Sequence, residues 1–270
     1  MLTQRAGEPR TPYPNVYLAA FQASLQAKFE YRVDLVIGVV TSMLMQGSAL
    51  SFLLIVLRNT PGLAGWSGPQ IVFLFGMTAA ALGGSEILFN QIWLLPQYVV
   101  AGDLDRLLTY PVRSLLFFLV TRPELHAIGN LITGSLYVAW SLHTLHVPVF
   151  VWLMLPVWWL CGTLLYTSAL VIVGCLSFRF VGPYSQQLLI PLNLLQATRY
   201  PLAVYPSWLK NVLLCVVPYG TFHYLPARFF FGKSASFWGL GLAPVAAVAL
   251  ALLAQGAWNL GLRRYESAGS

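Results

Sequence analysis

Hydrophobic residues run along this chain in long blocks, separated by short stretches in which the polar residues collect. A helix needs about 20 mostly apolar residues to cross a membrane. Six blocks approach or exceed that length: residues 34–57, 70–93, 123–142, 149–177, 184–200 and 236–260. The pattern predicts an all-α polytopic membrane protein with six transmembrane helices, built as a single transmembrane domain over residues 1–270.

The segment before the first block has a different pattern. Over residues 14–32, Leu18, Phe21 and Leu25 recur at helical spacing, with glutamines and a glutamate on the opposite face. Such a division into two faces is typical of a helix that lies in the membrane interface. The sequence therefore predicts an N-terminal amphipathic helix outside the spans.

Composition supports a membrane class. Hydrophobic residues make up 58% of the chain and charged residues only 9%, with a mean hydropathy of +0.71; soluble domains carry about 25% charged residues. The net charge is +7, but the basic residues are scattered and form no run, so a nucleic-acid partner is not expected. Basic residues punctuate the ends of apolar blocks, which suits orientation signals and contact with membrane lipid.

The basic residues also predict the orientation, because cytoplasmic loops carry an excess of Lys and Arg. With both termini inside, the cytoplasmic set is the larger: Arg5, Arg10, Lys28, Arg32, Arg106, Arg113, Arg122, Arg179, Arg263 and Arg264. The extracytoplasmic set is Arg58, Arg199, Lys210, Arg228 and Lys233.

A short polar stretch, AGDLDRLLTYPV at residues 101–112, interrupts the apolar pattern after the second block. Asp103 can cap a helix that starts at Leu104, and Pro111 ends it because its ring cannot continue the turn. One face of this helix carries Leu104, Leu107 and Leu108, and the other carries Asp105, Arg106 and Thr109. Taken alone, the stretch is equally compatible with an ordinary cytoplasmic loop.

The chain then returns to the membrane through a second short helix. The motif TRPE that follows fits a capping box, in which Thr121 and Glu124 bond each other's backbone N–H groups. We expect this box to open the third span.

A second unusual segment, residues 203–233, is hydrophobic but broken by Pro206, Pro218 and Pro226. The intervals between these prolines are too short to span a bilayer and suit re-entrant or interfacial helices. The segment lies on the outer side of the predicted topology, before the last span.

The two stretches together resemble the type-2 permease family of ATP-binding-cassette (ABC) transporters, the membrane subunits of drug, lipid and polysaccharide exporters. The resemblance is to the branch with a Gly-Asp-Leu-Asp motif, here residues 102–105 followed by Pro111. It extends to a Tyr-Pro, Pro, Pro-Ala pattern, here at residues 205–206, 218 and 226–227, and covers nearly the whole chain in element order.

The resemblance implies a permease subunit of an exporter in the bacterial inner membrane. It implies a dimeric ATPase partner that binds ATP and Mg, and a second permease copy or a related permease. Residues 102–110 would form the coupling helix, whose leucine face seats in a groove of the ATPase while its charged groups offer ion pairs. The residues concerned are Gly102, Asp103, Leu104, Asp105, Arg106, Leu107 and Leu108.

Polar residues inside the predicted spans are candidates for the translocation pathway. Glu86 lies inside the second span, with Asn90 one turn later, and an ionisable residue at that depth is either functional or bonded to a neighbouring helix. The fifth span carries a polar face that lines either a pathway or a helix interface: Gln186, Asn193, Gln196 and Tyr200.

Small residues in the second span predict close helix packing. Ala79 with Gly83, and Ala80 with Gly84, are pairs spaced four residues apart. Such pairs let neighbouring backbones approach, so we assign them to packing and not to chemistry.

No residues suggest catalysis, a metal site or a bound cofactor in this chain. The stretch ARFFFGKS, residues 227–234, fits a relaxed phosphate-loop pattern, but three consecutive phenylalanines do not curl around a phosphate. His143 and His146 are too few for a metal, and the three cysteines read as buried hydrophobes. ATP hydrolysis is therefore expected in a separate chain.

Two other functions fit a polytopic membrane protein. A secondary transporter normally shows several intramembrane carboxyls or paired broken helices, and a membrane-embedded enzyme shows a catalytic cluster near an interface. This sequence has one buried carboxyl and no such cluster. Either function would operate without an ATPase.

Overall fold

The computed structural model describes residues 14–58, 62–110, 112–179, 184–234 and 236–265. In these ranges the fold is helical, apart from one isolated bridge between Leu63 and Trp66. The α-helices are α1 (Pro14–Glu30), α2 (Arg32–Arg58), α3 (Gly68–Phe89), α4 (Leu95–Ala101), α5 (Leu104–Leu108), α6 (Ser114–Val120), α7 (Ile128–Thr144), α8 (Val149–Gly174), α9 (Leu189–Ala197), α10 (Ser207–Asn211), α11 (Tyr224–Phe230) and α12 (Trp238–Arg264).

Four helical runs in the described ranges are long and apolar enough to cross a membrane. They are Arg32–Ile55, Gly68–Ala101, Val149–Phe178 and Trp238–Arg264. A fifth crossing exists if Ser114–Val120 and Leu125–Thr144, which meet at a bend of 71°, count as one broken span. The chain is therefore a multi-pass membrane protein, as the sequence predicts.

The predicted fifth span, residues 184–200, is shorter than expected. It consists of a five-residue 3-10 turn (Tyr184–Leu188) and the nine-residue helix α9. After Ala197 the chain makes a turn towards Pro201, which limits the helical length. This segment falls below the roughly 20 residues that a full crossing needs, so the six-span topology stays a prediction.

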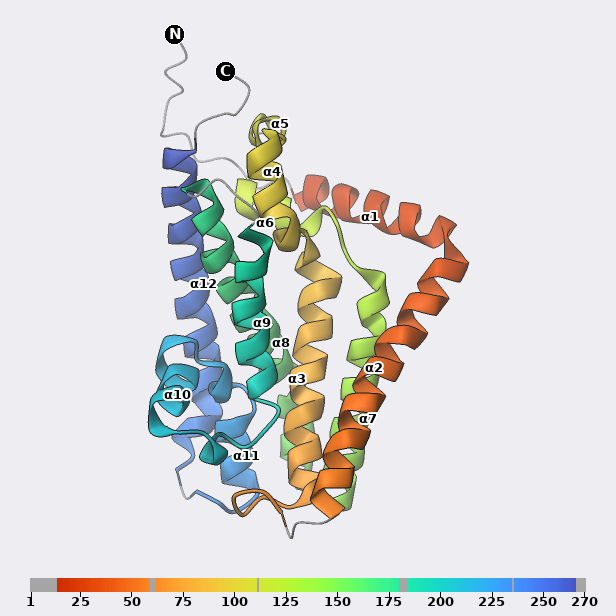
Figure 1. The fold of residues 1–270 in the computed structure, drawn as a ribbon, viewed down its shortest axis with the longest axis vertical. Helices are drawn as coiled ribbons and strands as arrows, with labels where there is room; N and C mark the ends of the chain where they lie inside the picture. The colour runs from red at the N-terminus through yellow and green to blue at the C-terminus, as the bar shows by residue number, and fades with distance from the viewer. Residues whose placement is uncertain (1–13, 59–61, 111, 180–183, 235, 266–270) are drawn as a thin grey trace.

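The two ends of the helical bundle are built differently (Figure 1). The short helices α4, α5 and α6 gather at one end, where α1 runs crosswise to the long helices before the chain turns into α2. Helices α10 and α11 lie at the opposite end. The predicted polar stretch and the predicted re-entrant segment are thus on opposite sides of the molecule.

Helix α3 is the buried centre of the bundle because small residues let its neighbours approach. A Cβ added at Gly83 would lie 2.7 Å from the backbone nitrogen of Leu131 on α7. One at Gly84 would lie 2.5 Å from the hydroxyl of Thr163 on α8. The two small-residue pairs of the sequence therefore face two different helices, which confirms their assignment to packing.

The helical run that starts as α3 continues without a long break to the polar stretch. A 3-10 turn (Asn90–Leu94) connects α3 to α4, and the whole run from Gly68 to Ala101 contains 34 residues. Such a run is longer than a bilayer requires, so its far end projects beyond the apolar part of the bundle. Helix α5 is attached to that projecting end.

The segment 203–233 folds back onto the bundle at the opposite end. Its longest helical run, Ser207–Val216, combines α10 with a π-turn and is too short to cross a membrane. Tyr219, Phe222 and His223 are fully buried. The segment is therefore an integral part of the core, and not a loose external loop.

Candidate functional site

Helix α5 is short and sharply bounded. Gly102 adopts a left-handed conformation (φ 74°) that ends α4, and the Asp105 N–H donates to its carbonyl at 3.2 Å. The Thr109 hydroxyl donates to the Arg106 carbonyl at 2.7 Å and closes the other end. Asp103 occupies the position before the helix, as predicted, but its side chain makes no capping hydrogen bond.

The leucine face of α5 points into the permease itself, and this corrects the prediction that it seats in an ATPase groove. Leu104 is fully buried and Leu107 nearly so, both within the main hydrophobic core. A leucine side chain at the end of a projecting helix is stabilised by burial, and the nearest apolar surface is that of the same chain. The surface left outward is polar and carries Asp103, Arg106 and Thr109.

An aromatic cluster below α5 joins this end of α4 and α6 to α12. Phe118 on α6 lies 5.5 Å from Tyr98 and 5.6 Å from Trp258 between ring centroids. The Trp258 indole N–H donates to the Ser114 hydroxyl at 3.0 Å. These rings come from three helices, so α4, α6 and α12 pack together at this end of the bundle.

The C-terminal end of α12 also reaches the carboxylates next to α5. Burial raises the pKa of the Tyr265 phenol, and the negative charges of Asp105 and Asp103 raise it further. The Tyr265 ring packs against Phe178 with 6.0 Å between centroids. Tyr265 therefore stays protonated near neutral pH, beside the acidic groups of α5.

Helix α1 is tied to both ends of α6, at Arg113 before it and at Glu124 in the loop after it. The Tyr17 hydroxyl accepts a hydrogen bond from the Arg113 N–H at 2.9 Å, and Lys28 forms an ion pair with Glu124 at 3.1 Å. Glu124 is thus not part of the predicted capping box, and the Thr121 hydroxyl donates to the Phe118 carbonyl instead. The ion pair across elements offers the Glu124 carboxylate a charged partner, which a capping box does not.

A chain of hydrogen bonds, buried at its middle members Gln46 and Asn130, links four elements of the bundle. Asn130 on α7 donates to the Glu86 carboxylate on α3 at 3.0 Å. The Gln46 amide on α2 donates to the Asn130 carbonyl oxygen at 3.1 Å. Arg199, in the turn after α9, donates to the Gln46 carbonyl oxygen at 3.2 Å. We call these four residues the Glu86–Arg199 network.

Arg199, which the sequence places at the extracytoplasmic end of the fifth block, is half-buried and folds back against the bundle. Its guanidinium lies 4.6 Å from the ring centroid of Phe75, a cation–π distance. Its Nε is buried and has no hydrogen-bond partner among the described residues. The network thus places a carboxylate and a guanidinium in the apolar bundle, bridged by two amides.

The segment 203–233, called the outer segment after its predicted side of the membrane, contacts the bundle next to Arg199. The buried His223 imidazole lies with Nε2 2.9 Å from the Thr198 carbonyl oxygen and 3.5 Å from the Thr78 hydroxyl. Thr198 directly precedes Arg199. The end of α9, the middle of α3 and the outer segment therefore meet at one place.

Comparison of the sequence with known protein families identifies one family. A model of ABC-2 family transporter proteins matches residues 43–269. This chain belongs to the ABC-2 transporter family. No curated protein and no solved structure matches it significantly. The matched range begins within α2 and includes α5, the outer segment and the whole Glu86–Arg199 network, so these are features of an ABC-2 permease.

The predicted pathway residues of this ABC-2 permease separate into two groups. Glu86 belongs to the network, whereas Asn90 lines a cleft beside Lys28 and lies outside the network. Gln186 and Asn193 are exposed on the 3-10 turn and on α9, and Gln196 and Tyr200 are half-buried. The structure therefore does not gather the predicted residues into one pathway in a single chain.

Metal coordination finds no support in the described ranges of this ABC-2 permease. They contain no group of three or more His, Cys, Asp or Glu side chains placed to hold a metal ion. His143 and His146 lie close in sequence at the end of α7, and the His146 ring is bonded to the Thr144 carbonyl at 3.2 Å.

Sequence reasoning missed Gln46, Asn130 and His223. Gln46 and Asn130 are single amides inside apolar blocks, which is the pattern of a buried polar group that needs a partner. That signal was available in this ABC-2 chain, but it does not say which polar groups pair. Only the packing of α2 against α7 brings the two amides together.

Proposed function

We propose that this ABC-2 family protein is the permease subunit of an exporter and forms a translocation pathway driven by a separate ATPase. A dimeric ATPase would dock on the outward face of α5 and bind the ATP and Mg. Its closure would move α5, and the movement would reach the spans through α4 and the aromatic cluster.

The geometry of α5 is the observation that carries this proposal. The helix is anchored by buried leucines, bounded by Gly102 and the Thr109 hydrogen bond, and attached to a 34-residue helical run. A rigid projection with a polar outer face suits a surface that a partner pushes. An ordinary loop would not need two fully packed leucines in five residues.

A second permease chain is part of the proposal. Gln186 and Asn193 are exposed on the surface of one chain, in a segment between two apolar spans. An amide that faces lipid is costly, so contact with a second copy or with a water-filled pathway stabilises it. We place the pathway between paired permease chains that share this face.

The orientation follows from charge. The end that carries α1 and α5 holds most of the basic residues of the described ranges, and the opposite end holds Lys210, Arg228 and Lys233. By the positive-inside rule, the α5 end faces the cytoplasm. We propose a bacterial inner-membrane protein with both termini cytoplasmic.

The purified permease alone is expected to show no ATP hydrolysis, because we find no nucleotide site in its sequence. When the permease is co-purified with its partner ATPase, hydrolysis should appear in an assembly of paired permeases and paired ATPases. The measurement is phosphate release by each preparation in the same lipid nanodiscs. Robust hydrolysis by the permease alone would contradict the proposal, and substrate transport without any ATPase would favour a secondary transporter.

Charge reversal on the outward face of α5 is expected to weaken the ATPase complex without unfolding the permease. The variant is Asp103→Lys with Arg106→Glu, and exposed ion pairs are worth about 0–1 kcal/mol each, so the loss of affinity should be modest. ATPase retention on affinity-tagged permease and the thermal midpoint of the permease measure the two effects.

Two single variants, Leu104→Ser and Leu116→Ser, give a matched comparison of a buried and an exposed leucine. Leu104 is fully buried, so its loss should destabilise the permease itself by roughly 2–5 kcal/mol. Leu116 is an exposed leucine on α6, and the same substitution there should cost little. A Leu104→Ser protein of normal stability that no longer binds the ATPase would show that the leucine contacts the partner after all.

A further inference from the structure

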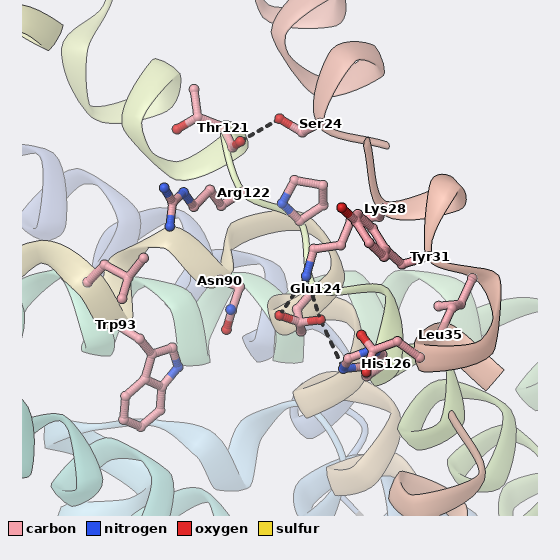
Figure 2. A pocket seen from close by; sticks show the side chains of 13 residues that line it. Ser24, Lys28, Tyr31, Leu35, Asn90, Trp93, Thr121, Arg122, Glu124 and His126 are labelled. Carbon is pink, nitrogen blue, oxygen red and sulfur yellow. Dashed lines mark hydrogen bonds and ion pairs between the residues drawn. The ribbon is translucent and has the colours of Figure 1, made fainter. Parts of the chain in front are cut away.

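A cleft of about 640 Å³ opens where α1 turns into α2 and meets the loop between α6 and α7 (Figure 2). Charged side chains from three elements line it: Lys28 on α1, Asp34 on α2, and Arg122, Glu124 and His126 around the loop. Lys28 and Asp34 precede residue 43, so part of the lining lies outside the range that the family model matches. Nothing in the proposed transport cycle uses this cleft.

One side of the cleft is a cluster of interacting polar side chains. Lys28 pairs with Glu124 at 3.1 Å, and the His126 ring lies 3.3 Å from Glu124 and 3.4 Å from Asp34. Figure 2 shows Lys28, Glu124 and His126 joined in this way. Asp34 has only the imidazole contact, and its side chain is 76% exposed. Its carboxylate is therefore open to a further cation.

The other side carries an uncompensated positive charge. Arg122 forms no ion pair within the part of the chain that the structure describes, and it is exposed. In Figure 2, Arg122 and Trp93 lie on the side of the cleft away from His126, with Asn90 between them and the cluster. The cleft thus offers a guanidinium at one side and an open carboxylate at the other.

The position of the cleft relative to the membrane limits what can fill it. Helix α1 runs crosswise to the long helices and exposes Leu18 and Phe29, two apolar side chains that lipid can cover. Trp93 and Tyr31 in the lining are aromatic residues typical of headgroup depth. The molecules present at that depth at the highest concentration are phospholipids.

We propose that this cleft binds the headgroup of a zwitterionic phospholipid with a primary amine. The lipid phosphate would accept hydrogen bonds from Arg122, whose planar fork suits phosphate oxygens. The ammonium would donate to Asp34, which a quaternary choline group cannot do because it has no N–H. The bound lipid would join α1 and α2 to the loop that leads from α6 into α7.

The test is native mass spectrometry of the full chain in detergent, titrated separately with phosphatidylethanolamine, phosphatidylcholine and phosphatidylglycerol. We expect preferential retention of phosphatidylethanolamine. Arg122→Gln should reduce its affinity about tenfold or more, as loss of a hydrogen bond between charged groups implies. Asp34→Asn should abolish the preference for ethanolamine over choline while phosphate-dependent binding persists.

Two matched controls and a competition separate this site from general attraction to lipid. Arg263→Gln removes an exposed arginine at the end of α12, and Glu30→Gln removes an exposed carboxylate of α1 that does not line the cleft. Both should leave affinity within about twofold. Equal retention of the three lipids, equal loss in Arg263→Gln, or displacement of the lipid by inorganic phosphate alone would overturn the proposal.

Discussion

Replacing Gly134 with valine is expected to disrupt the fold of this ABC-2 permease more than any surface change. A Cβ at this position would lie 2.5 Å from the backbone nitrogen of Ala80 and 2.6 Å from the carbonyl oxygen of Gly76. Both obstacles are backbone of the central helix α3, so neither can rotate away. Overpacking of this kind costs about 3 kcal/mol or more, which corresponds to a fall of roughly 6 °C or more in the thermal midpoint.

Gly256→Val is the matched control. Gly256 is also a helical glycine, in α12, but a Cβ there meets no atom within 4 Å. The same substitution should therefore leave expression and the thermal midpoint close to those of the parent protein. Fluorescence-detected size-exclusion chromatography with a thermal ramp measures both variants. A Gly134→Val protein that melts with the parent would mean that α3 and α7 do not pack as described.

The second large effect is expected at the Glu86–Arg199 network. Arg199→Gln leaves the Glu86 carboxylate without a cation in its network, and Glu86→Gln leaves Arg199 without its anion. Loss of a hydrogen-bond partner of a charged group in such a partly buried network costs roughly 1–3 kcal/mol. The double variant removes both charges, so it should be more stable than the sum of the two single losses predicts.

A double-mutant cycle on the thermal midpoints, or on chemical unfolding, gives the coupling. Linked residues in one network show coupling energies of about 0.5–3 kcal/mol. A control pair, Glu86→Gln with Lys233→Gln, combines the carboxylate with a lysine outside the network that bonds the Gly65 carbonyl. Strict additivity for Glu86 with Arg199 would remove the electrostatic link between them.

The same variants separate structure from transport at Glu86. If Glu86 also lines the pathway, Glu86→Gln within the assembled transporter should alter substrate-stimulated ATPase activity beyond the change in stability. A purely structural role should lower the yield or the thermal midpoint and leave the specific activity of the folded fraction unchanged. Normal stability together with normal activity would eliminate both roles.

Patterns among residues close in the sequence predicted much of the architecture. Apolar blocks separated by polar stretches indicated spans, and the matched helical runs confirm a multi-pass membrane protein. The bounded polar helix after the second block was also visible, because Gly102 is a local determinant of where α4 ends and the next helix can begin. The helix in the 184–200 block is shorter than the block itself, since hydropathy does not record where a turn ends a helix.

The local sequence pattern does not predict which surface the apolar face of a helix packs against. The leucines of α5 were expected to contact a partner, but Leu104 is buried in its own chain. Periodicity shows that one face is apolar and says nothing about which surface covers it. The same ambiguity applies to Arg199, because a basic residue near a block end can extend into solvent or, as here, fold back against Phe75.

The sequence by itself determined the membrane class, the family motifs and the positions where helices can begin and end, because these depend on residues close in the chain. Tertiary structure alone decided which polar groups share a bond. Glu86 and Asn130 are 44 residues apart, and Gln46 and Arg199 are 153 apart. An amide in an apolar span must find a partner, since an unsatisfied polar group is costly there. Which partner it finds is fixed only when the packing of α2, α3, α7 and α9 brings the candidates within hydrogen-bond distance.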